Sequence, residues 1–159
     1  MTSTLRAKRV LLIGIAVIVI VGAILAWALL SDSDHPVSAG QSIVVTVTAA
    51  SLEDMYGYQF NLNFDHDQLE LTRTVARVPD MMIFSRTLSD HELVGSTMVG
   101  ERDGISGRNI AVSEIIFVAL QDLNLSEFDV SITSVNIVRS DMEYIEDIEG
   151  WTLSKSVQP

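Results

Sequence analysis

The 159-residue chain contains no cysteine. This absence excludes disulfide scaffolds, thiol catalysis and Cys-ligated zinc or iron–sulfur sites. Basic residues are also scarce: 10 Lys and Arg stand against 21 Asp and Glu, which gives a formal net charge of −11 and a pI of about 4.4. Such a chain lacks the positive surface with which proteins bind nucleic acid, so we expect no nucleic-acid partner.

The sequence also lacks the common motifs of catalysis. No G-x-S-x-G elbow, phosphate loop or dinucleotide fingerprint is present. The three histidines show no i,i+4 pair of the kind that metallopeptidases use (His35, His66 and His91). With 21 acidic residues, accidental carboxylate pairs are numerous, and none is singled out as a glycosidase pair. We therefore expect a protein that is not an enzyme and that has no catalytic residues.

One short acidic motif leaves a choice open. Asp65 and Asp67 flank a histidine and resemble the start of a calcium loop, in which alternate carboxylates converge on the ion. The chain then offers Gln68 and Leu69 where a third acidic ligand and a glycine are needed. This favours turn-capping carboxylates and leaves a weak calcium site as the alternative, and we assign no metal ligands.

Residues 10–30 form one apolar run, VLLIGIAVIVIVGAILAWALL. As a helix this run would span about 32 Å, close to the bilayer core of about 30 Å. Three basic residues precede it and two aspartates follow it closely. The positive-inside rule then predicts a cytoplasmic basic segment over 1–9, a single transmembrane helix over 10–30, and an extracellular remainder.

The same run is compatible with a secretory signal peptide. Residues 26–28 read Ala-Trp-Ala, which resembles a cleavage site. The run is longer than the usual signal core of about 7–15 residues, which favours an uncleaved anchor. In both cases the rest of the chain is exported, and it would be secreted if the segment were removed.

After a linker over residues 31–39, the apolar period becomes two. β-Branched residues alternate over 43–49, and the strictest alternation runs over 58–64. Residues 51–54 should end the first of these strands, and the less regular residues 73–91 form either a short strand or an irregular apolar loop that lies over the core. Further strands are expected over 69–72, 92–100, 110–120 with a bulge, and 130–138, with a final hairpin over 144–153. The pattern predicts an all-β antiparallel sandwich over 40–154, followed by a tail over 155–159.

Residues 56–65, YGYQFNLNFD, followed by Leu-Glu-Leu at 69–71, resemble the signature of the cohesin family. An earlier strand containing Val45 and Val47 and a later Gly-Ile-Ser-Gly at 104–107 occur in the matching order, so the resemblance covers roughly residues 40–150. His66 stands where the family commonly has proline. The resemblance implies a jelly-roll β-sandwich of about nine strands.

The resemblance also implies a docking function. Cohesins bind dockerin domains on one sheet face, and in cellulosomes such pairs hold polysaccharide-degrading enzymes. Calcium would then belong to the dockerin partner, and this chain would need no cofactor. The residues themselves place three amides in an outward row on one strand, and family position adds the strand near residues 97–101 with a rim residue. The candidate partner-binding residues are Gln59, Asn61, Asn63, Thr97, Met98, Glu101 and Arg102.

Two other functions compete with docking. A carbohydrate-binding module of the related sandwich type would use exposed aromatic side chains, for which Tyr56, Tyr144 and Trp151 are the candidates. A pilin-like filament subunit would also combine an apolar N-terminal helix with a β head. That alternative lacks the expected processing glycine after Lys8 and Arg9.

Overall fold

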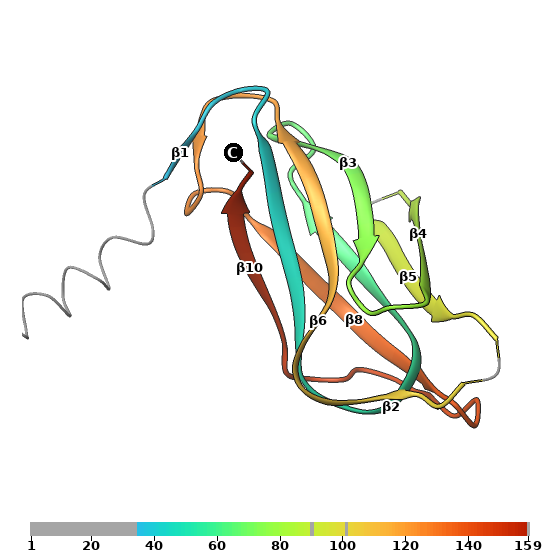
Figure 1. The fold of residues 1–159 in the computed structure, drawn as a ribbon. Helices are drawn as coiled ribbons and strands as arrows, with labels where there is room; N and C mark the ends of the chain where they lie inside the picture. Colours follow the sequence, from blue (N-terminus) through green and yellow to red (C-terminus); the bar gives the residue numbers. More distant parts are fainter. Residues whose placement is uncertain (1–34, 90, 101, 159) are drawn as a thin grey trace, which may run out of the picture. The chain divides into compact units, whose positions relative to one another are not determined.

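The computed structural model describes residues 35–89, 91–100 and 102–158 (Figure 1). Within these ranges the chain forms ten strands, pairs them antiparallel and has no helix, which confirms the all-β antiparallel prediction. The strands are β1 (Pro36–Val37), β2 (Ser42–Phe64), β3 (Leu69–Ala76), β4 (Met81–Thr87), β5 (Glu92–Met98), β6 (Ile105–Ala119), β7 (Leu123–Asn124), β8 (Val130–Arg139), β9 (Tyr144–Ile145) and β10 (Trp151–Val157).

The predicted N-terminal segments fall outside this description. The basic segment 1–9 and the predicted transmembrane helix 10–30 both lie outside the described residues. In the described part of the chain, no helix has the length and hydropathy needed to cross a bilayer.

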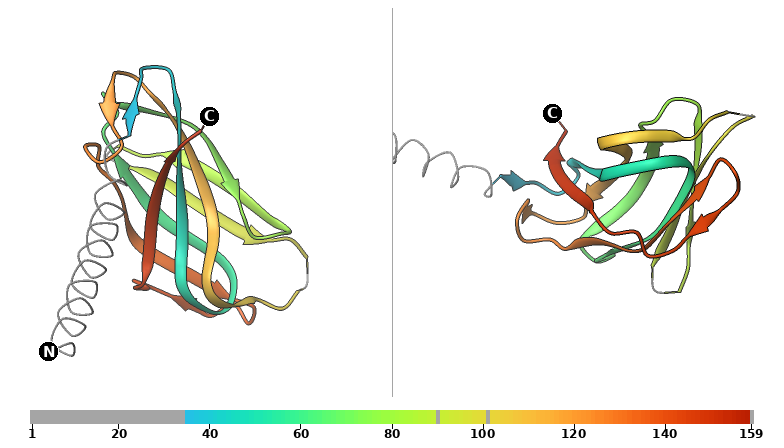
Figure 2. Two further views of the ribbon diagram at one scale, coloured as in Figure 1. Left: turned by 60° about the vertical axis from the view of Figure 1, so that its left-hand side comes forward. Right: turned by 90° about the horizontal axis from the view of Figure 1, so that it is seen from below.

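Strand β2 belongs to both layers of a sandwich. Its first half pairs with β6 and β10, and its second half pairs with β5 and β8. The first layer therefore has the order β3-β6-β2-β10, and the second layer has the order β4-β5-β2-β8-β9. Figure 2 shows the long strand crossing from one layer to the other. The prediction that residues 51–54 end the first strand was wrong, because the strand bends there and continues.

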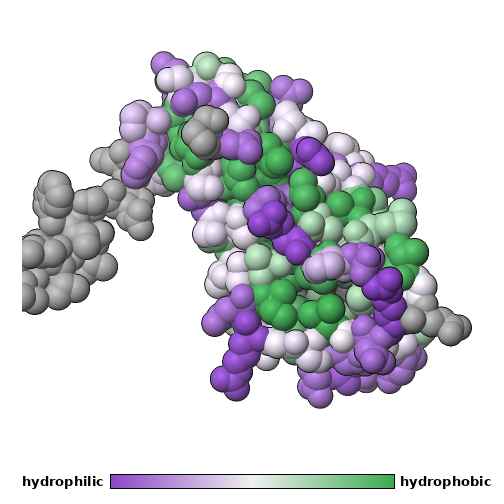
Figure 3. Space-filling model, viewed as in Figure 1, coloured by the Kyte–Doolittle hydropathy of each residue, from purple (hydrophilic) through white to green (hydrophobic). Residues whose placement is uncertain are grey.

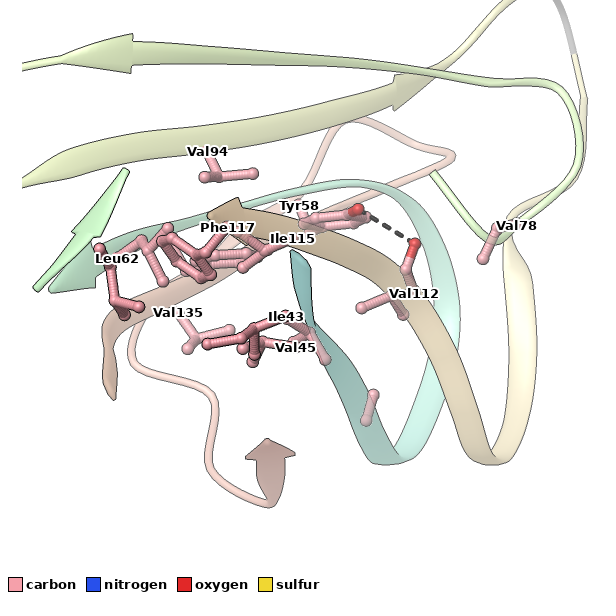
Figure 4. Packing of buried hydrophobic residues seen from close by; sticks show 14 of the residues in the cluster. Ile43, Val45, Tyr58, Leu62, Val78, Val94, Val112, Ile115, Phe117 and Val135 are labelled. Atoms are coloured by element: carbon pink, nitrogen blue, oxygen red, sulfur yellow. Dashed lines mark hydrogen bonds between the residues drawn. The ribbon is translucent and has the colours of Figure 1, made fainter. Parts of the chain in front are cut away.

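The core lies between the layers and follows directly from the alternation in the sequence. Along the first half of β2, every second side chain is completely buried, from Ile43 to Ala49. Phe60 of the second half and Phe117 of β6 are also fully buried. Figure 4 shows the packing around Phe117. Apolar area removed from water in this way is the main term that favours folding.

One polar group in the core is hydrogen-bonded to the backbone. The Tyr58 hydroxyl donates to the carbonyl oxygen of Val112 at 3.2 Å, and burial raises the pKa of this phenol (Figure 4). Trp151 packs against Tyr58, with ring centroids 5.6 Å apart. The prediction of Trp151 as an exposed aromatic was therefore wrong: its ring is half-buried against the core.

The bend in β2 is held by Asp54, which has a positive φ of 55°. Its carboxylate accepts hydrogen bonds from the Ser140 hydroxyl at 2.7 Å and from the Gly104 amide at 3.1 Å. These bonds tie the bend to the start of β6 and to the end of β8. The hydrogen bond from Ser140 is the largest cause that lowers the pKa of Asp54, and the amide of Gly104 adds to it.

Of two sequence predictions about strand pairing, one was confirmed and one was wrong. The bulge expected in residues 110–120 is confirmed, because Ala111 and Ser113 pair with adjacent residues of β2 and leave Val112 as the extra residue. The final hairpin over 144–153 was wrong, because β9 pairs with β8 while β10 pairs with β2 in the other layer.

Both ends of the expected domain extend further than the sequence indicated. Val37 from the expected linker is buried, and β1 pairs with β7. Strand β10 runs to Val157, into the expected tail. Within it, Lys155 lies 4.1 Å from the centroid of the Phe128 ring, so the first part of that tail packs on the domain.

Replacing Phe60 with alanine should destabilise the fold by about 3–5 kcal/mol, because it removes a fully buried aromatic side chain and leaves a cavity. The midpoint of urea unfolding measures the loss. Ser154→Ala, at an exposed position of β10, should change stability by no more than about 0.5 kcal/mol. Equal effects of the two substitutions would contradict the assignment of the core.

Asp54→Asn should lower stability at neutral pH, with a deficit that shrinks in acid. The pKa of Asp54 is lowered in the folded state, so its ionised form stabilises the fold above the ordinary carboxyl pKa, and this contribution is lost as the pH falls through the lowered value. Thermal midpoints of both proteins between pH 7 and pH 2 test this. Asp67→Asn, at an exposed turn, serves as the control and should show no such convergence.

Candidate functional site

The outer face of the second layer is a flat surface built from five strands. Its residues are those that alternate with the buried positions, and the strand register places them in rows across the sheet. We call this surface the second-layer face. It consists of Met82, Phe84 and Arg86 from β4, Leu93, Gly95 and Thr97 from β5, Gln59, Asn61 and Asn63 from β2, Ser131 and Thr133 from β8, and Tyr144 from β9.

The ring of Phe84 reaches over Gly95 on the neighbouring strand. A Cβ atom placed on Gly95 would come within 2.3 Å of the Cζ atom of Phe84, so the ring occupies the space that a side chain on β5 would fill. The Phe84 side chain is nevertheless 54% exposed. Since Gly95 is paired with Gln59 of β2, the ring reaches towards the middle of the second-layer face. The missing side chain at residue 95 therefore creates an aromatic platform.

The predicted amide row lies on this face. Gln59, Asn61 and Asn63 are all half-buried, and they alternate with core residues as expected. The Nε2 atom of Gln59 donates to the Tyr144 hydroxyl at 3.1 Å, and the Nδ2 atom of Asn63 donates to Oγ1 of Thr133 at 3.3 Å. These bonds hold two of the amides in place, and amides both donate and accept hydrogen bonds.

The remaining predicted contacts have different locations. Thr97 is exposed on the second-layer face. Met98 is only 7% exposed and points to the interior, so its prediction as a surface contact was wrong: it follows Thr97 on the strand and faces the opposite way. Arg102 is exposed and forms an ion pair with Asp80 beside the β5–β6 connection. Glu101 lies outside the described residues.

Sequence reasoning missed the apolar part of the face. Met82 is 64% exposed, and together with Phe84 it belongs to a regular edge strand, in a stretch for which the sequence left a short strand and an irregular loop open. The outward and inward residues of this strand are all apolar over 81–84, so no polar alternation marks it. Tyr144, suggested as an exposed aromatic, is 48% exposed on the same face.

The opposite edge of the second layer is acidic. Residues 141–149, which include β9, contain five acidic residues and no basic ones. Arg139, just before them, forms ion pairs with Glu143 and Glu53. The second layer thus carries apolar and basic side chains on β4, which includes Arg86, while the acidic residues at its opposite edge lie in the segments before and after β9.

The motif at residues 65–67 forms a turn. The Oδ1 atom of Asp65 accepts a hydrogen bond from the Asp67 amide at 2.9 Å, as in an Asx turn. Among the described residues, no group of three or more acidic or histidine side chains converges as a metal site would require.

Gly95→Ala should displace the Phe84 ring while leaving the protein folded. The new methyl group occupies the position of the ring, but the end of a phenylalanine side chain moves easily, so we expect a stability change within about 1 kcal/mol. Nuclear Overhauser effects between the Phe84 ring and the residue 95 amide should weaken. They should persist in Thr97→Ala, and their persistence in Gly95→Ala would contradict the described packing.

Solved structures with a similar fold come from cohesin modules, whereas no protein-family model and no curated protein sequence matches the chain. A cohesin module from a family 33 glycoside hydrolase of Clostridium perfringens aligns with a TM-score of 0.51 and 12% identity, over 76% of this chain and 96% of that one. The sixth cohesin of Acetivibrio cellulolyticus scaffoldin B, solved with a mutant Cel5 dockerin, gives 0.50 and 16%, over 68% and 83%.

A third match is a chain of the CaDoc0917–CaCohA2 complex, with a TM-score of 0.53 and 8% identity, over 71% of this chain and 85% of that one. All three identities are low, so the agreement concerns the arrangement of the strands. The chain has a cohesin-like fold.

Proposed function

We propose that the chain is a docking module that binds a dockerin-bearing protein through its second-layer face. The observation that carries this proposal is the set of exposed apolar side chains on that face, among them Phe84, whose ring reaches from the edge strand β4 over Gly95 of β5. Similar structures titled as cohesins, one of them solved with a dockerin, support the same class of partner.

Exposed apolar residues are concentrated around this layer. Seven large apolar residues are exposed among the described residues, and six of them lie on second-layer strands or the turns that end them: Met82, Phe84, Leu88, Val99, Met142 and Tyr144. Protein interfaces have an apolar centre with aromatic and methionine side chains and a polar rim. On the side of the molecule seen in Figure 3, apolar surface is divided into separate patches by polar side chains.

The face is suited to binding and offers no arrangement for catalysis. Its central polar groups are amides and hydroxyls, which orient a partner by hydrogen bonds but are poor acids and bases. In this proposal the chain has no cofactor and the calcium belongs to the dockerin. The partner could be a polysaccharide-degrading enzyme, so that polysaccharide is contacted only indirectly.

We also propose that residues 10–30 anchor the domain in the cell membrane, with the N-terminus in the cytoplasm and the docking domain outside. The support is the uncharged run of about 20 residues and the basic flank that precedes it. An exported docking module on such an anchor would hold its partner at the cell surface.

A carbohydrate-binding function is the second candidate, because Phe84 and Tyr144 are both exposed on the second-layer face. Aromatic side chains on a flat face can stack on sugar rings. Sedimentation with insoluble cellulose or chitin tests this candidate. Retention that Phe84→Ala abolishes would favour it over docking.

The docking proposal predicts calcium-dependent binding of a dockerin module encoded in the same genome. Phe84→Ala should weaken that binding about 30-fold or more, as for a central aromatic at an interface. Isothermal titration calorimetry of the detergent-solubilised full chain measures the affinity. A chelator should abolish binding and leave the thermal midpoint of the chain alone unchanged.

The matched control is Ser154→Ala, which changes an exposed residue of the first layer. It should leave the affinity unchanged. If no dockerin from that genome binds, or if both variants weaken binding equally, the second-layer face is not the docking surface.

A further inference from the structure

A groove of about 440 Å³ opens between β3 and β4, on the side where the edges of the two layers face one another. Its walls include Arg73 on β3, Ser85 and Thr87 on β4, and Glu92 on β5. Ser85 and Thr87 alternate with the outward Phe84 and Arg86. The groove is therefore separate from the second-layer face and belongs to the inner side of β4.

Glu92 is an unusual residue for this position. It is only 6% exposed, it pairs with Leu62 in the middle of the second layer, and it faces the groove. In the described part of the chain, its carboxylate has no hydrogen-bond or ion-pair partner. Its oxygens are not among the fully buried polar atoms that lack a partner, so the carboxylate is open to the groove. Inward charges commonly protect edge strands, but β5 lies between β2 and β4 and has no free edge.

A positive charge lines the same groove without meeting Glu92. Arg73 is exposed on β3, and no ion pair joins it to Glu92 or to any other described residue. Glu70 on the same strand adds a second carboxylate to the lining. Two carboxylates and one guanidinium thus surround one space and remain apart, which is the arrangement expected where a ligand with the opposite charges fits between them.

The rest of the lining suits a small organic molecule. The rings of Phe64 and His66, which are tilted against one another with centroids 4.2 Å apart, both line the groove and give it an aromatic wall. The hydroxyls of Ser85 and Thr87 lie on the opposite strand. A volume of 440 Å³ lies within the range of about 300–1,000 Å³ that is usual for small-molecule sites.

We propose that this groove binds a basic amino acid. An ammonium group of the ligand would pair with Glu92, its carboxylate would pair with Arg73 in a bidentate manner, and its second cationic group would lie towards Glu70. The two positive groups and one negative group of such a ligand match the three charges of the lining. The acidic domain around the groove favours the approach of a net cation.

The test is a titration of the ¹⁵N-labelled full chain in detergent micelles with L-lysine, followed by NMR. Amide signals of β3, β4 and residue 92 should shift and saturate, while signals of β10, which lies outside the groove lining, should not. Glu92→Gln keeps the shape of the side chain and removes its charge, so it should weaken binding at least 10-fold. Glu127→Gln, an exposed residue outside the lining, is the control and should bind as the unaltered chain does.

A second probe separates the two ends of the ligand. Cadaverine has two ammonium groups and no carboxylate, so Arg73→Gln should weaken L-lysine binding and leave cadaverine binding unchanged. Arg73 is exposed, so this variant tests the proposal even if Glu92→Gln fails to fold. Absence of shifts in the groove up to about 10 mM L-lysine, or equal binding by Glu92→Gln and the control, would overturn it. Because the groove is separate from the second-layer face, either outcome leaves the docking proposal standing.

Discussion

The passage of one strand through both layers is the constraint on which the rest of the structure depends. Strand β2 contributes backbone partners to four other strands, two in each layer. The bend between its halves is fixed by Asp54, whose carboxylate binds groups from the start of β6 and the end of β8. The position of the amide row relative to the core is therefore influenced by a few hydrogen bonds at the bend of the same strand.

The second-layer face illustrates how a missing side chain creates a surface. Gly95 contributes nothing to the core, yet the absence of its side chain lets Phe84 lie across β5 while staying exposed. A larger residue there would raise the ring and disrupt the flat face. The polar residues around this platform are held by neighbours such as Tyr144, so a partner meets a surface that is already organised.

The sequence predicted most of the layers because alternation and burial coincide on the interior strands. Residues 43–49 and 58–64 each have one apolar and one polar or β-branched face, and both faces lie as expected. It did not predict β4, because residues 81–84 are apolar on both sides of the strand. It misplaced Met98 because the Val, Thr and Gly residues around it do not indicate which side chains face inward. The pairing of β10 with β2 was also beyond reach, since it joins distant parts of the chain.

The pairing of β10 with β2 determines when folding of the first layer can finish. Trp151 lies opposite Ala49, and Val157 lies opposite Ile43, so one margin of the first layer stays open until the final strand arrives. Until then, half of β2 presents unpaired amides and carbonyls, which are templates for intermolecular association. The whole chain must therefore be synthesised before the last step of its folding, and a chain truncated before residue 151 would keep an unpaired edge on the first layer.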